Sequence, residues 1–248
     1  MLKTVRYLAA AALVAVCGIA QADNFCGELA NHYGPYDYRK RGQVNLEIVE
    51  HAHFTADVEK GIRGATSDMG IGADLDYTLR AIPNHHRALA TLTRVAIRDR
   101  IVTVPHTKWP VECYLDRAQR FAPDDGMVWA TYGGYLFAVG RSDDAMAKFK
   151  QAYILEPENA TINYNLGLLY LKNKDYDNAL KHAEKAYAMK FPLPGLKNKL
   201  VEAGKWRPRQ PDAAPATPAP ETAPATPAAE APAAPEATPP AAAPTPRP

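Results

Sequence analysis

Between residues 72 and 206 the apolar positions recur three and four residues apart, which is the spacing of a helix with one buried stripe. The segment YNLGLLYLKNKDYDNALKHAEKAY, residues 164–187, contains two such runs with the polar turn Lys172 to Asp175 between them. Two short helices joined by a tight turn form a hairpin, and a lone hairpin cannot bury its apolar face. The pattern therefore predicts helix pairs that stack on further pairs.

A repeat with a period of 34 residues runs through this region. Residues 126–159 align with residues 160–193, so that Gly133 matches Gly167 and Ala145 matches Ala179. A helix-turn-helix unit of this length resembles the tetratricopeptide repeat family. The first copy carries the resemblance on Trp129, Tyr132, Gly133, Leu136, Ala145, Phe149, Ala152 and Pro157.

The resemblance implies an all-α fold, a short right-handed α-solenoid of antiparallel helix pairs with about three hairpins plus a half unit. The helical domain is expected over 72–206, with repeats at about 86–125, 126–159 and 160–193 and a capping helix at 195–206. The unit 86–125 carries an insertion in its internal turn, between about Asp99 and Trp109. Residues 23–71 do not match the repeat, and we expect them to form an irregular N-terminal cap.

The first 22 residues have the pattern of a secretory signal peptide. Lys3 and Arg6 precede an apolar run, and Ala20-Gln21-Ala22 forms a small-x-small cleavage site. The run is too short for a transmembrane helix. The pattern predicts a periplasmic or secreted protein with no integral membrane span; the alternative is a membrane-anchored lipoprotein acylated on Cys17.

Residues 207–248 form a Pro/Ala-rich tail that holds 14 of the 22 prolines and no aromatic residue. A segment of this composition cannot offset its ordering entropy by burial, so it is predicted to be disordered, with stiff polyproline II stretches. It would serve as a spacer; the alternatives are a tether across a crowded space or a ligand for a proline-binding module.

Charge and cysteine content narrow the function classes. The chain has 29 basic and 27 acidic residues, and loss of Lys3 and Arg6 with the signal peptide leaves a net charge of zero. This balance argues against nucleic acid or an anionic membrane as partner. In an exported chain, Cys26 and Cys113 predict one disulfide that contributes about 4 kcal/mol, the alternative being two free thiols.

In the tetratricopeptide family the first helix of each hairpin lines a concave groove that binds peptides. The resemblance thus implies a non-catalytic interaction module that holds a peptide or another envelope protein, in an assembly or scaffolding role. The expected lining is Arg87, Arg94, Arg98, Met127, Thr131, Phe137, Tyr164, Asn165, Leu168 and Lys172. The alternative for the arginines is a solvated basic face that complements acids of the cap.

By the same resemblance, Cys113 lies on the convex back of its helix pair. A bond to Cys26 would then fold the cap over that back and leave the concave side free.

An envelope enzyme or metal-binding protein with its site in the N-terminal segment is the alternative function. Its candidate ligands are His51, His53 and Glu59, and the pair His85 and His86. Adjacent helical residues point about 100° apart, so the pair cannot easily grip one ion. No third ligand has a recognisable spacing, and neither a cofactor nor a catalytic residue is predicted.

Overall fold

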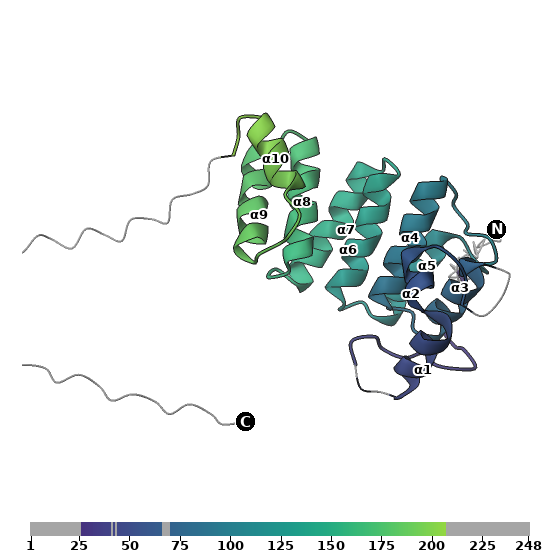
Figure 1. The fold of residues 1–248 in the computed structure, drawn as a ribbon. Helices are drawn as coiled ribbons and strands as arrows, with labels where there is room; N and C mark the ends of the chain where they lie inside the picture. The colour runs from purple at the N-terminus through teal and green to yellow at the C-terminus, as the bar shows by residue number, and fades with distance from the viewer. Residues whose placement is uncertain (1–25, 41, 43, 66–69, 207–248) are drawn as a thin grey trace, which may run out of the picture. The chain divides into compact units, whose positions relative to one another are not determined.

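A computed structural model describes residues 26–40, 42, 44–65 and 70–206. The predicted signal peptide, Cys17 and the Pro/Ala-rich tail lie outside the described residues. Within them, every regular element is an α-helix (Figure 1). The ten helices are α1 (Val44–His53), α2 (Ala56–Lys60), α3 (Ile71–Ala81), α4 (His86–Asp99), α5 (Val111–Phe121), α6 (Gly126–Ala138), α7 (Ser142–Leu155), α8 (Ala160–Lys172), α9 (Tyr176–Ala188) and α10 (Gly195–Glu202).

Antiparallel pairs stack side by side from α4 to α9, which confirms the predicted all-α solenoid (Figure 1). Asp125 and Asn159 accept hydrogen bonds from backbone N–H groups in the first turns of α6 and α8, and Asp175 does so for α9. Such caps satisfy donors that a helix leaves unpaired at its start. Pro123 and Pro157 stand just before these starts, where proline prevents the preceding helix from continuing.

Small residues set the distance between the two helices of a pair. A Cβ atom at Gly133 of α6 would lie 3.0 Å from the ring of Phe149 on α7, which is closer than such contacts normally are. Ala145 and Ala152, also on α7, are fully buried in the same cluster. The repeat pattern of small residues is therefore a packing requirement.

The N-terminal region contains two helices within the expected cap. Residues 44–53 and 56–60 are helical, as α1 and α2. Short α2 packs against both α3 and α4, and its Val58 is fully buried in the core formed by those helices. It thus takes the place of a first helix in the stack, so that α2 and α3 complete the expected half unit as a shortened pair.

The segment between α4 and α5 closes this end of the solenoid. The backbone N–H of Lys108 donates to Asp76 on α3, and the Tyr114 hydroxyl donates to the same carboxylate. Val104 is buried in the core with α3 and α4. The longer turn therefore packs on α3 instead of projecting into solvent.

At the opposite end, α10 packs on α8 and α9. Leu196 and Leu200 are fully buried there, and a Cβ atom on Gly167 of α8 would lie 2.4 Å from Leu196 Cδ2. The missing side chain of Gly167 thus makes room for the capping helix.

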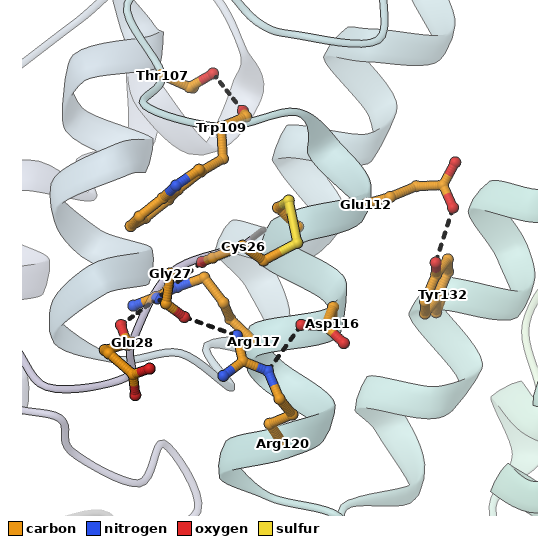
Figure 2. The surroundings of a disulfide bond; sticks show 11 residues. Cys26, Gly27, Glu28, Thr107, Trp109, Glu112, Asp116, Arg117, Arg120 and Tyr132 are labelled. Atoms are coloured by element: carbon orange, nitrogen blue, oxygen red, sulfur yellow. Dashed lines mark hydrogen bonds and ion pairs between the residues drawn. A yellow bond between two sulfur atoms is a disulfide. The ribbon is translucent and has the colours of Figure 1, made fainter. Parts of the chain in front are cut away.

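The predicted disulfide between Cys26 and Cys113 is present (Figure 2). It fixes the start of the described chain to α5, where the Arg117 guanidinium donates to the carbonyl oxygens of residues 26–28. Arg117 is almost fully buried and stacks on the Trp109 ring at 4.4 Å. Burial lowers the pKa of Arg117, and the three carbonyl acceptors offset the cost of burying its charge.

Candidate functional site

A groove of about 470 Å³ lies across the first helices of three successive pairs, α4, α6 and α8. Helix α6 forms its floor, and α4 and α8 form its walls. We call this the α4–α6–α8 groove. Its lining residues are Ala90, Thr93, Arg94, Ile97, Arg98, Met127, Ala130, Thr131, Gly134, Tyr135, Thr161 and Asn165.

The floor is apolar and smooth because of the residues that α6 contributes. Helix α6 has no charged residue between Gly126 and Ala138. A Cβ atom added at Gly134 would meet no heavy atom of the described residues within 4 Å, so this position opens directly into the groove. A glycine without a packing neighbour leaves backbone accessible to a partner.

Three of the expected groove residues lie on α4, and the structure separates them. Arg87 does not line the groove; its guanidinium pairs with the Glu59 carboxylate, with Nε 2.7 Å from Oε1, which raises the pKa of Arg87 and lowers that of Glu59. Arg98 lines the groove but pairs with Asp99 at 2.7 Å and donates to the Gly61 carbonyl. Arg94 donates to the Glu59 carbonyl and to Thr91 Oγ1.

The arginine row therefore receives the C-terminal end of α2, whose free carbonyls carry partial negative charge. This arrangement matches the alternative in which the basic face complements the cap. At this end α2 contacts α4, whereas the Cys26 segment is bonded to α5, so the cap touches both helices of this pair.

The other expected residues divide between the groove and the downstream packing. Met127, Thr131 and Asn165 line the groove. Tyr164 is buried and stacks on Phe191 with ring centroids 4.3 Å apart, so the chain before α10 covers it. Leu168 packs with the same buried cluster as Tyr164. Lys172 donates to Ser142 Oγ and lies 4.9 Å from the centroid of the Phe137 ring. The groove lining therefore does not include the expected residues Phe137, Tyr164, Leu168 and Lys172.

Thr93, Ile97 and Tyr135 line the groove but were not expected there. Ile97 is three residues after Arg94, so the helical period alone indicates a shared face. Tyr135 is only 4% exposed, and burial raises its pKa. The presence of Tyr135 in the lining depends on how α4 packs against α6, and the sequence pattern does not predict that packing.

The histidines of the alternative metal site serve the contacts between the cap and the solenoid. His53 Nδ1 lies 2.9 Å from Asp74 Oδ1, and its ring stacks on Tyr77. His85 lies 3.0 Å from Glu50, and burial lowers the pKa of its imidazole. His86 pairs with Asp125 at 2.8 Å, and His51 is exposed beside a shallow hollow. In the part of the chain that the structure describes, no three His, Cys, Asp or Glu side chains converge as metal ligands would.

Among the described residues, no helix has both the length and the apolar character that crossing a membrane requires.

Comparison with known proteins agrees with this arrangement of helices. The tetratricopeptide repeat family model matches residues 133–191, from the middle of α6 to just beyond α9. A comparison with curated proteins gives no match.

Two structures of MamA are among the similar solved structures. One is a mutant, 20% identical, with 59% of this chain and 77% of that chain covered; the other, of MSR-1 MamA, is 19% identical, with 58% and 76% covered. Both have a TM-score of 0.37, so the assignment rests on the family match and the paired helices. Residues 133–191 of this chain thus match the tetratricopeptide repeat model, and the antiparallel pairs from α4 to α9 have the arrangement that this match implies.

Proposed function

We propose that this protein is a non-catalytic interaction module of the cell envelope, which holds a peptide or protein partner in the α4–α6–α8 groove. Tetratricopeptide repeats are protein-interaction scaffolds, and the observation that carries the site is the open floor at Gly134. Its lining is largely apolar with a few polar groups, as binding sites commonly are.

Export to an oxidising compartment is the second part of the proposal. It is supported by the Cys26–Cys113 disulfide, since such bonds persist in exported proteins and are rare in the cytosol. Either a periplasmic or a secreted location is compatible with this bond, and an acylated Cys17 would add a lipid anchor.

Filling the groove tests the function. Gly134→Gln would place a side chain in the open space above the floor, and replacing a helical glycine stabilises a helix by roughly 0.5–1 kcal/mol. Its matched control is Ala147→Gln, at an exposed position of α7 outside the lining. We expect wild type and Ala147→Gln to capture the same partner from an envelope extract and Gly134→Gln to lose it while melting no lower.

Partner capture by Gly134→Gln at the wild-type level would refute the groove as the binding site. Fractionation of cells that produce the full chain tests the location: recovery of the protein in the cytoplasm with Cys26 and Cys113 reduced would refute export.

A further inference from the structure

We propose that the α4–α6–α8 groove recognises an extended segment with one acidic side chain flanked by apolar residues, and that Arg94 binds that carboxylate. The inference rests on the proposed function and adds the chemistry of the partner. Its starting point is the charge balance of the row Arg87, Arg94 and Arg98.

Two of these arginines are neutralised within the protein. Arg87 pairs with Glu59, and Arg98 pairs with Asp99. Arg94 donates to the Glu59 carbonyl and to the Thr91 hydroxyl, and its charge helps to lower the pKa of Glu59, but it forms no ion pair with a carboxylate of the described residues. Among the described residues, no acidic side chain lines the groove. The lining therefore offers one positive charge that a partner's carboxylate can neutralise by charge-assisted hydrogen bonds.

The neighbours of Arg94 indicate what surrounds that carboxylate. Ala90, Arg94 and Ile97 lie four and three residues apart on α4, and all three face the groove. Arg94 lies between the apolar residues Ala90 and Ile97, so it would suit a partner segment in which an acidic residue lies between apolar residues. A run of acids would place further charges against Ala90 and Ile97, at a desolvation cost with no compensating cation.

Two further lining residues carry polar groups. Tyr135 is 96% buried by its surroundings (4% exposed) and lines the groove, and its hydroxyl has no hydrogen-bond partner among the described residues. On α8, the Asn165 amide also has no partner within the described part of the chain. This amide can bond to the backbone of an extended segment.

The bounds of the groove favour a short segment. The lining includes no residue of α2, which contacts α4, and neither Tyr164 nor Phe191, which stack on each other beyond Asn165. Neighbouring helix axes lie about 8–10 Å apart, so three helices span about 20 Å, the length of about six extended residues.

The test uses three nine-residue peptides of alanine and valine. The first has a central glutamate and both ends blocked, and the second replaces that glutamate with glutamine. The third has the central glutamine and a free C-terminal carboxylate, which separates a side-chain carboxylate from a chain end. Binding to the full chain is measured by calorimetry.

We expect the glutamate peptide to bind about tenfold more tightly than either glutamine peptide. Arg94→Gln should reduce this ratio to about one without weakening the blocked glutamine peptide, whereas the matched control Arg87→Gln should keep the ratio. Asn165→Ala should weaken the two blocked peptides equally, because it removes a contact to the backbone. Gly134→Gln should abolish binding of all three.

Equal affinity of wild type for the two blocked peptides, or no binding at about 1 mM, overturns the inference without needing any variant. Binding of the free-ended peptide as tightly as the glutamate peptide also overturns it. If Gly134→Gln leaves peptide binding intact, the proposed function fails. If Gly134→Gln abolishes binding but wild type binds the glutamate and glutamine peptides equally well, only the recognition of the carboxylate fails.

Discussion

His182 gives the sharpest test of the packing in the last repeat. Its ring lies inside the solenoid, 6% exposed, between Tyr153 and Tyr170. The Asn163 amide donates to two backbone carbonyls, so its oxygen faces His182 Nδ1 at 2.9 Å and accepts a hydrogen bond from the Nδ1–H group. The neutral ring fills this site, and a second proton has no acceptor that the described residues provide.

Burial, with smaller effects of Lys181 and Lys185, lowers the pKa of His182 to about 4. The unfolded chain has a histidine pKa of about 6.5, so protons bind the unfolded state first. Stability from this group is therefore complete above pH 6.5 and is lost as the pH falls towards 4. Between pH 7 and pH 5 these two pKa values correspond to about 2 kcal/mol.

The variant His182→Asn keeps a donor near the position of Nδ1 but removes the titrating ring. We expect wild type to lose about 2 kcal/mol more stability than the variant between pH 7 and pH 5, measured by urea unfolding followed by circular dichroism. Distant groups such as His85 titrate in both proteins and cancel in the comparison. Equal losses, or an NMR titration that places the imidazole pKa at 6 or above, would refute the reasoning.

Two further perturbations test the ends of the solenoid. The double variant Cys26→Ala/Cys113→Ala should lower the free energy of unfolding by about 4–5 kcal/mol, because the bond closes a loop with a sequence separation of 87; an unchanged melting temperature under oxidising conditions would contradict this. Gly167→Ala should destabilise the protein by about 1–3 kcal/mol despite better helix propensity, since the new methyl group overlaps Leu196. Adding Leu196→Ala should remove the overlap, so a double variant whose losses simply add would argue against that contact.

The regular part of the fold could be read from the sequence because its signals are local. Gly133 with Phe149, and Ala145 with Ala152, sit at fixed positions of a 34-residue unit, so two copies are enough to identify the pairs. Helix α2 gave no such signal: five residues are too few for a helical period. Its place in the stack comes from the burial of Val58 and from contacts with α4 about 30 residues away.

The same limit applies to the candidate site. The family resemblance placed Arg94, Arg98, Met127, Thr131 and Asn165 on the groove side, and all five line the groove. It could not show that Glu59 neutralises Arg87, because the two are 28 residues apart and meet only after the cap has packed. Nor could it show that Phe191 covers Tyr164, a contact made by an irregular segment. The helical period shows which residues share one face of a helix, but which other segments cover that face depends on tertiary packing.

The covalent loop also divides the molecule mechanically. The Cys26–Cys113 bond encloses α1 to α4 and the first residues of α5, whereas α6 to α10 lie outside it. A force applied to the two ends of the chain would bypass the enclosed residues and act on the downstream repeats, which contact only their neighbours. Breaking the bond would release about 300 Å of additional contour length. The helices enclosed by the bond would thus stay folded under a force that unfolds the downstream repeats one after another.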